Sequence, residues 1–254
     1  MPDFVTVVGA GLAGSEAAWQ LAKRGVPVLL IEMKPVKYSP AHHSPGYAEL
    51  VCSNSLKAEH LSNASGLLKA ELRAMDSLIL KCAEESRVPA GGALAVDRDV
   101  FSEKITRALR SHPLVTHETR VVDQLPDAPC VVATGPLTDP ALTDAIQRRT
   151  GAGALNFFDA AAPIVTADSL DMEKVFRASR YGRGTDDYLN CPMTEAEYDA
   201  FYDALVGAEL AEVHDFEKKL VFEGCLAVEI LASRGRQTLA FGPLKPVEIG
   251  RAHV

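Results

Sequence analysis

A glycine-rich turn between a predicted strand and a predicted helix is the feature that most constrains this chain. The apolar run Phe4–Val8 predicts a strand, Gly9-Ala10-Gly11-Leu12-Ala13-Gly14 follows at once, and Ser15–Arg24 has the pattern of a helix that ends at Gly25. Glycines at these spacings allow a tight turn and a close approach of the backbone to a pyrophosphate, which then lies at the positive end of the helix. The turn therefore predicts a dinucleotide-binding unit.

A second apolar strand supports this interpretation. Val28–Ile31 is continuously apolar, as expected for a parallel sheet that is buried on both faces, and it ends at Glu32. A carboxylate at that place can accept a hydrogen bond from a ribose hydroxyl, and it would repel a 2′-phosphate. FAD or NAD is therefore favoured over NADP. The alternative is a turn in which the glycines serve packing alone.

The rest of the chain predicts an α/β fold without internal repeats. Residues 33–65 form a long polar loop, which in a compact domain is usually functional. We expect helices over 66–86, 99–111, 138–151, 194–213 and 226–234, and strands over 114–122, 129–134, 163–167 and 237–241. The helix at 194 begins with a capping box, Thr194 to Glu197.

Composition excludes several classes of protein. The chain has 254 residues, of which 47% are hydrophobic, and no apolar run approaches the length of a membrane span. The N-terminus enters a strand without a basic segment before it, so we expect a cytoplasmic protein. Five cysteines at wide spacings, without a Cys-x-x-Cys pair, favour neither a disulfide framework nor a metal site. An important cysteine here is more simply a reactive thiol.

The net charge of −8 is unevenly distributed. Ten acidic residues and no Lys or Arg lie between Asp186 and Glu217. A short basic stretch precedes them, and it consists of Lys174, Arg177, Arg180 and Arg183. Because nucleic-acid affinity comes largely from neutralising phosphates, an acidic chain binds RNA only through such a local basic face. The alternative for this stretch is an ordinary solvated surface.

The five cysteines differ in their sequence context. Cys225 lies just before a predicted helix, where a thiol pKa is lowered, so it is a candidate nucleophile. Cys52 lies inside the long polar loop. Cys82 and Cys130 fall on apolar elements and are interpreted as small core residues, whereas the context of Cys191 leaves its role open.

Val131-Val-Ala133-Thr-Gly135 resembles the second conserved segment of flavoproteins with a dinucleotide-binding fold. In those proteins the segment brings the chain back to the cofactor. This resemblance moves the choice from NAD to FAD and makes Ala133 and Gly135 candidate cofactor contacts.

Motifs in order over residues 4–247 resemble the folate- and FAD-dependent tRNA (uracil-5-)-methyltransferase family, which makes ribothymidine in the tRNA T-loop. They include Leu12-Ala-Gly-Ser-Glu-Ala-Ala-Trp19, Glu49-Leu-Val-Cys-Ser-Asn-Ser-Leu56, Val88-Pro-Ala-Gly-Gly-Ala-Leu-Ala-Val-Asp-Arg98 and Phe241-Gly-Pro-Leu-Lys-Pro246. The related family that modifies the wobble uridine shares the glycine-rich start, but the first two motifs favour the methyltransferase.

The resemblance implies a reaction and roles for several residues. Methylenetetrahydrofolate would supply the carbon, reduced FAD would carry it and reduce it, and NAD(P)H would regenerate the flavin. Cys225 would add to C6 of uracil, which makes C5 nucleophilic. Cys52 would assist proton removal at C5 or guard the flavin adduct. The target base must leave its stack to reach the site, and the basic stretch would contact phosphates.

The resemblance also suggests a domain organisation. We expect a Rossmann-like FAD-binding domain over 1–160 and part of an inserted α/β domain over 161–247. Residues 248–254 depart from the family pattern and resemble the translation of a common sequencing adapter. We therefore expect a truncated, inactive piece of the enzyme with a non-native tail. Two alternatives are a non-catalytic segment that binds FAD or ADP, and a general FAD oxidoreductase without an RNA substrate.

Overall fold

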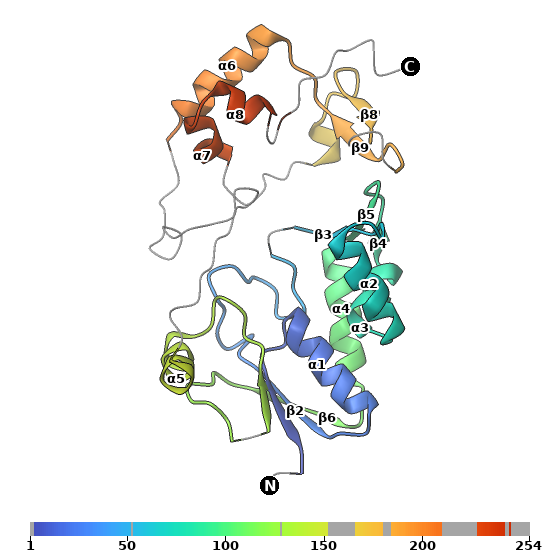
Figure 1. The fold of residues 1–254 in the computed structure, drawn as a ribbon, viewed down its shortest axis with the longest axis vertical. Helices are drawn as coiled ribbons and strands as arrows, with labels where there is room; N and C mark the ends of the chain where they lie inside the picture. Colours follow the sequence, from blue (N-terminus) through green and yellow to red (C-terminus); the bar gives the residue numbers. More distant parts are fainter. Residues whose placement is uncertain are drawn as a thin grey trace. The chain divides into compact units, whose positions relative to one another are not determined.

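A computed structural model of the chain describes residues 3–51, 53–127, 129–151, 166–179, 184–209, 228–241 and 244. Backbone contacts divide the chain into two compact units (Figure 1). Unit 1 comprises residues 1–157 and 177–188, and unit 2 comprises residues 158–176 and 189–254. The predicted tail, residues 248–254, lies outside the described residues, and the assignment of functions to domains stays a prediction.

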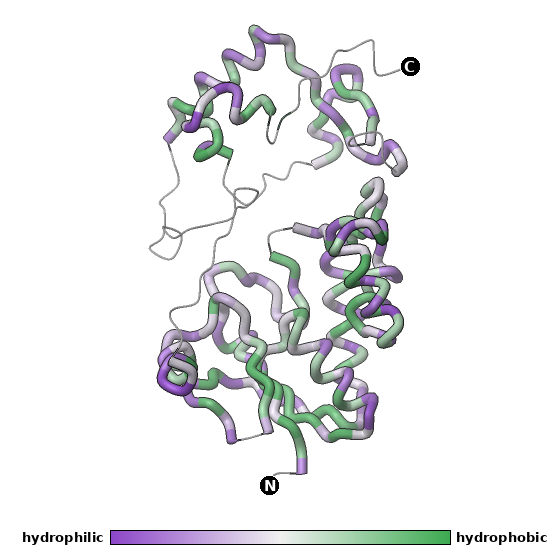
Figure 2. The backbone as a smooth tube through the Cα atoms, viewed as in Figure 1, coloured by the Kyte–Doolittle hydropathy of each residue, from purple (hydrophilic) through white to green (hydrophobic). Residues whose placement is uncertain are grey.

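A four-stranded parallel sheet forms the centre of unit 1. Its strands follow the order β6-β2-β1-β7, with β1 at Val5–Val8, β2 at Val28–Glu32, β6 at Val115–Thr119 and β7 at Cys130–Val132. Most residues of β1 and β2 are buried, and these strands are strongly hydrophobic in Figure 2. Burial on both faces explains the continuous apolar run of the second strand, and the predicted α/β class is confirmed.

Helices cover both faces of this sheet (Figure 1). Val7 packs in one core with α1 (Leu12–Lys23), α3 (Leu78–Glu85) and α4 (Arg98–Arg110). Its neighbour Val8 points to the opposite face, because side chains alternate along a strand, and packs there with Leu142 of α5, which spans Pro140–Thr150. Asp139 caps α5 and Gly151 ends it with φ of +67°, as the sequence predicted.

A smaller antiparallel sheet, β3-β5-β4, adjoins these helices. It consists of β3 (Ser55–Ala58), β4 (Arg87–Val88) and β5 (Ala93–Val96). The predicted polar loop therefore contains a strand that its sequence did not indicate. The pairing of β3 with β5 is irregular between Ser55 and Ala58, where Lys57 has a left-handed φ of +67°.

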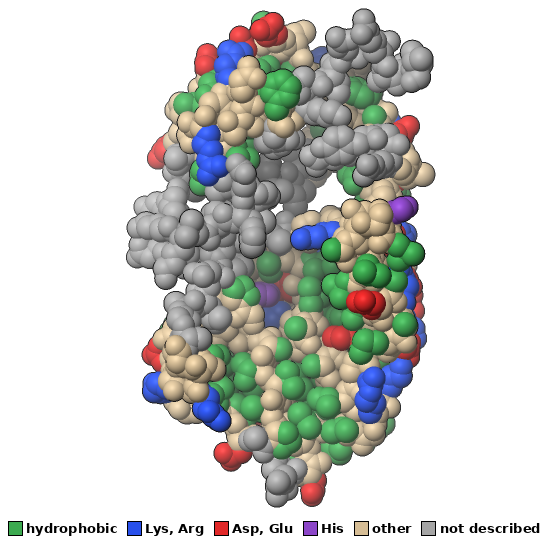
Figure 3. All heavy atoms as spheres, viewed as in Figure 1, with side chains coloured by type: hydrophobic (Ala, Val, Ile, Leu, Met, Phe, Trp, Pro, Cys, Tyr) green, Lys and Arg blue, Asp and Glu red, His purple; other side chains and the backbone are tan. Residues whose placement is uncertain are grey.

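The predicted helix over 66–86 is wrong in one respect, because it is two helices. α2 (Ala64–Ala74) ends at Met75, Asp76 has φ of +55°, and the Ser77 hydroxyl accepts a hydrogen bond from Leu80 N–H to begin α3. The change of direction also divides the expected apolar face. Leu61, Leu67, Leu68 and Met75, in and beside α2, are each more than half exposed, and Figure 3 shows apolar side chains on the surface of this unit.

Unit 2 is built from short elements. It contains the 3₁₀ turn η1 (Ala167–Ser169), α6 (Glu195–Val206), α7 (Val228–Ser233) and α8 (Arg236–Phe241). The strands β8 (Phe176–Ala178) and β9 (Tyr188–Asn190) form a two-stranded sheet. The sequence boundaries between the two units fall within these strands.

Three predictions fall in unit 2. The capping box of α6 is confirmed, although the helix ends at Val206 and not near residue 213. The predicted strand over 237–241 is wrong, because helix α8 restarts directly after Gly235 and buries Leu239. Of the predicted strand over 163–167, residues 163–165 lie outside the described residues. The described residue Ala167 does not belong to a strand, because it begins η1.

Candidate functional site

The first and third glycines of the turn are required by packing. Gly9 has φ of +94°, and its N–H donates to the Ile31 carbonyl at 2.8 Å. A Cβ on Gly9 would lie 2.7 Å from the Ala133 carbonyl oxygen, and a Cβ on Gly14 would lie 1.8 Å from the Gly9 carbonyl oxygen. These contacts are too short for any side chain. The two glycines therefore let β1, α1 and the segment after β7 pack closely.

The middle glycine has a different environment. Among the residues that the structure describes, a Cβ on Gly11 would meet no atom within 4 Å. Among the described residues no side chain caps the N-terminus of α1, and Leu12 and Ala13 in its first turn are exposed. The first N–H groups of a helix attract anions. The open space at Gly11 therefore fits a phosphate group, and the neighbouring residues Ala10, Leu12 and Ala13 frame it.

Glu32 lies at the same edge of the sheet, as predicted. Its side chain is buried, and its two oxygens accept hydrogen bonds from Ala10 N–H at 2.7 Å and from Lys34 N–H at 3.0 Å. A carboxylate has room for further donors. The glycine turn and the candidate ribose contact are thus joined directly.

The segment after β7 also reaches this edge. Ala133 N–H donates to the Val8 carbonyl at 2.8 Å, and Gly135 has φ of +73° with open space around its Cα. The structure brings Gly9–Gly14, Glu32, Ala133 and Gly135 together at the carboxyl ends of parallel strands. Ligands bind at this edge in open α/β sheets.

Lys34 and Glu49 form a buried ion pair beside the glycine turn. Lys34 Nζ lies 3.3 Å from Glu49 Oε2 and donates to the Gly46 carbonyl at 2.7 Å. Glu49 Oε1 accepts from the N–H groups of His43 and Ser44 at 2.9 and 3.0 Å. Burial acts to raise the pKa of Glu49, but these hydrogen bonds and the Lys34 charge outweigh it, so the pKa lies below its ordinary value.

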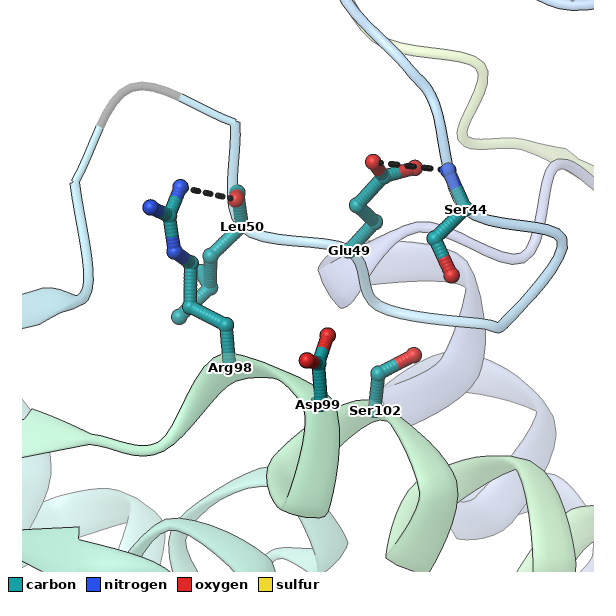
Figure 4. A pocket seen from close by; sticks show the side chains of 6 residues that line it. All are labelled: Ser44, Glu49, Leu50, Arg98, Asp99 and Ser102. Carbon is teal, nitrogen blue, oxygen red and sulfur yellow. Dashed lines mark hydrogen bonds between the residues drawn. The ribbon is translucent and has the colours of Figure 1, made fainter.

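A small pocket lies between this loop and the start of α4 (Figure 4). Its volume is about 120 Å³, and its lining residues are Ser44, Glu49, Leu50, Arg98, Asp99 and Ser102. Arg98 donates to the Leu50 carbonyl at 3.3 Å. Pockets for cofactors are several times larger. The pocket is therefore too small for a dinucleotide.

Tyr47 fixes the same loop to the fold, and sequence reasoning missed it. Its carbonyl accepts from the Ser102 hydroxyl at 2.6 Å, and its N–H donates to Thr106 Oγ1 at 2.8 Å. Its ring stacks on His117 of β6. Burial raises the pKa of Tyr47 and lowers that of His117. A lone tyrosine in a polar loop gives no signal of such burial.

The described cysteines are not grouped at the glycine turn. Cys82 is buried in α3, and burial raises its thiol pKa to about 11, in agreement with a core role. Cys130 is half-buried at the start of β7, and Cys191 is exposed. The two candidate catalytic thiols, Cys52 and Cys225, lie outside the described residues.

The predicted basic stretch is described only in part. Lys174 is 82% exposed and pairs with Asp171 at 3.0 Å, which agrees with a solvated surface. Arg177, in β8, is exposed. Arg180 and Arg183 lie outside the described residues. RNA contact by these four residues stays a prediction.

Two features are absent from the described ranges. No helix there is long and apolar enough to cross a bilayer. The same ranges hold no group of three or more His, Cys, Asp or Glu side chains arranged to bind a metal ion.

Known proteins resemble most of this sequence. A sequence model of the family described as glucose inhibited division protein A matches residues 4–253. The methylenetetrahydrofolate--tRNA-(uracil-5-)-methyltransferase TrmFO of Lactiplantibacillus plantarum is 60% identical over 243 residues, 96% of this chain and 55% of that protein. The protein of the same name from Listeria monocytogenes is 58% identical over 97% of this chain and 57% of its own length. The chain spans about half the length of these curated relatives.

These relatives carry the name of the enzyme family that the sequence motifs resemble. A solved structure, that of Aquifex aeolicus GidA, covers 50% of this chain and 21% of its own at 15% identity, with a TM-score of 0.40. The family match extends over almost all of the sequence, from residue 4 to residue 253. The chain therefore belongs to the glucose inhibited division protein A family.

Proposed function

We propose that this chain binds FAD at the glycine turn and belongs to an enzyme that methylates a T-loop uridine of tRNA at C5. One observation carries the FAD proposal. Gly11 alone among the three glycines of the turn has open space beside it, at an uncapped helix N-terminus and close to Glu32. The names of relatives that are 58–60% identical support the methyl-transfer proposal.

Several residues of this edge would hold the cofactor. The backbone of Ala10–Ala13 faces the place for the pyrophosphate, Glu32 would accept from a ribose hydroxyl, and Ala133 and Gly135 would line the far side. Bound FAD would carry the one-carbon unit of methylenetetrahydrofolate and the electrons that reduce it, and NAD(P)H would supply those electrons. A soluble cofactor and a tRNA substrate fit a cytoplasmic enzyme.

The thiols would act on the uracil. The Cys225 thiolate forms a bond to C6, and the electrons of the C5–C6 double bond move toward the C4 carbonyl, which makes C5 a nucleophile. C5 then bonds to the one-carbon unit. Cys52 takes the C5 proton, the bond between that carbon and its donor would break, and a hydride from reduced FAD would complete the methyl group. The C6–sulfur bond then breaks and restores the double bond. The base must be unstacked for this chemistry, and Lys174, Arg177, Arg180 and Arg183 would hold the flanking phosphates.

The test is transfer of labelled carbon from methylenetetrahydrofolate to a tRNA transcript, with FAD and NADPH present. With the whole enzyme to which this chain belongs, we expect label at the T-loop uridine, and we expect Cys225→Ala in that enzyme to lose transfer while it retains flavin. Cys191→Ala is the matched control, because it removes an exposed thiol to which the proposal assigns no role. Full activity of Cys225→Ala would show that its assignment as nucleophile is wrong.

A second candidate function is nucleotide binding without catalysis. Its support is the open space at Gly11 beside Glu32, which indicates a bound nucleotide and does not itself indicate methyl transfer. A purified chain that is yellow with bound flavin but transfers no carbon would support this second function. A chain that transfers hydride to its flavin but ignores tRNA would instead be a general oxidoreductase.

A further inference from the structure

A continuous series of hydrogen bonds joins the glycine turn to the loop before Cys52. Ala10 N–H donates to Glu32 Oε2 at 2.7 Å, and Lys34 N–H donates to Glu32 Oε1 at 3.0 Å. The Lys34 side chain then reaches Glu49 at 3.3 Å. Through Glu49 the series ends at the N–H groups of the 43–44 segment. It therefore runs from the glycine turn to the loop segment 43–49, which precedes Cys52 in the sequence.

Burial makes this series stiff. The side chains of Lys34 and Glu49 are only 6% and 13% exposed. Water cannot readily replace a partner in such a buried pair, so moving one group leaves the other with an uncompensated charge. Displacement of the loop therefore requires the pair to break.

A second connection runs parallel to the first. Ala48 N–H donates to the Ala10 carbonyl at 2.8 Å, so the loop binds the glycine turn through its backbone as well. Ala10 is fully buried and takes part in both connections. A ligand that orders the turn at Ala10 therefore acts on the loop from two sides.

We propose that Glu49 is a positioning residue, which through Lys34 and Glu32 couples occupation of the dinucleotide site to the placement of residues 43–51. The inference rests on the proposed FAD site. A ribose hydroxyl that donates to Glu32 adds a third donor to this carboxylate and holds it in the orientation that Ala10 and Lys34 already select. Because coupling between two sites is reciprocal, breaking the pair also weakens binding of the nucleotide.

The experiment uses the whole 254-residue chain, with ADP as the probe. Hydrogen exchange of the 43–51 amides and the alkylation rate of Cys52, both resolved by peptide mass spectrometry, are measured with and without saturating ADP. Glu49→Gln keeps the acceptor for the two N–H groups and removes the charge that faces Lys34. Glu85→Gln is the matched control, since it removes one carboxylate from a half-exposed ion pair with Lys104.

In the wild-type chain we expect ADP to slow exchange over 43–51 and to change the Cys52 rate, while the exposed Cys191 keeps its rate. In Glu49→Gln we expect both ADP effects to disappear and the ADP dissociation constant to rise about fivefold or more. The control should behave as the wild type. A purely structural Glu49 would change the rates without ADP but leave the ADP-dependent difference in place, and that result would overturn the proposal.

If Glu49→Gln does not fold, the measurements with and without ADP on the wild-type chain still test the proposal. ADP that binds without slowing exchange over 43–51 refutes the coupling and leaves the FAD proposal standing. A chain that does not bind ADP refutes both.

Discussion

Replacing Gly11 with alanine should separate nucleotide binding from folding. The new Cβ meets no atom within 4 Å, and the backbone there, with φ of −69°, suits any residue. Alanine is a poorer helix N-cap than glycine but restricts the unfolded chain more, and these two effects are each about 1 kcal/mol and opposite in sign. The free energy of unfolding should therefore change by less than about 1 kcal/mol.

The same methyl group should weaken nucleotide binding. It occupies the space that the proposed pyrophosphate enters, above the first N–H groups of α1. An extra methyl group in a closely packed contact costs about 1–3 kcal/mol, which is about 5- to 150-fold in the dissociation constant for ADP.

Gly14→Ala is the matched control with the opposite outcome. Its Cβ would lie 1.8 Å from the Gly9 carbonyl oxygen, 2.9 Å from the Gly9 carbonyl carbon and 3.3 Å from the Ala133 Cβ. Backbone cannot yield as a flexible side chain does, so α1 must shift away from the sheet. We expect a loss of about 3 kcal/mol in the free energy of unfolding.

Two measurements decide the matter. Urea unfolding followed by the fluorescence of Trp19, the single tryptophan, reports directly on α1. Calorimetric titration with ADP reports binding. If Gly11→Ala binds ADP as tightly as the wild type, the phosphate does not lie at Gly11. If Gly14→Ala is as stable as the wild type, α1 does not pack closely on the Gly9 carbonyl.

Three further predictions concern strain, charge and thiol reactivity. Lys57→Gly should stabilise the chain by up to about 1 kcal/mol in urea unfolding. The left-handed φ of +67° costs lysine about 1–2 kcal/mol, and the greater freedom of glycine in the unfolded chain offsets about 0.5–1 kcal/mol of that gain; a loss of stability would contradict the strain. The lowered pKa of Glu49 means that its contribution to stability is present above its ordinary value of 4.5 and is lost as pH falls below it. The free energy of unfolding of Glu49→Gln should therefore depend less on pH in that acid range. At pH 8, iodoacetamide should label the exposed Cys191 of the native chain and should not label Cys82, which is buried and has a thiol pKa of about 11. Equal labelling of the two thiols would refute the burial of Cys82.

Where the sequence predicted correctly, the cause is local. Asp139, Pro140 and Gly151 define the ends of α5 by side-chain capping, a fixed φ and a left-handed φ, and each acts within a few residues. The capping box of α6 is local in the same way. The glycine turn and the strands beside it follow from spacing and from apolar runs.

Where the sequence misled, a contact distant in the chain decided the structure. The break at Asp76 and Ser77 lies inside a continuous helical pattern, and it is stabilised by the Ser77 hydroxyl, which donates to Glu16 at 2.8 Å. Strand β3 exists because it pairs with β5, some forty residues later in the chain. The sequence predicts a strand over 237–241, where the structure has helix α8. Six residues of mixed polarity are too few to show whether their apolar positions repeat with the period of a helix or of a strand.

The sequence by itself determined that a turn with three glycines lies between β1 and α1 and that an acidic residue ends the next strand, since spacing and residue type suffice for that. Only the tertiary structure decided what each glycine does. Room for a ligand depends on atoms from other parts of the chain. The Ala133 carbonyl fills the space at Gly9 and the Gly9 carbonyl fills it at Gly14, whereas no atom of the described part of the chain lies within 4 Å of a Cβ at Gly11. The ion pair of Lys34 and Glu49 was likewise decided by the fold, because two charges fifteen residues apart in a polar loop become buried partners only when the loop packs on the sheet edge.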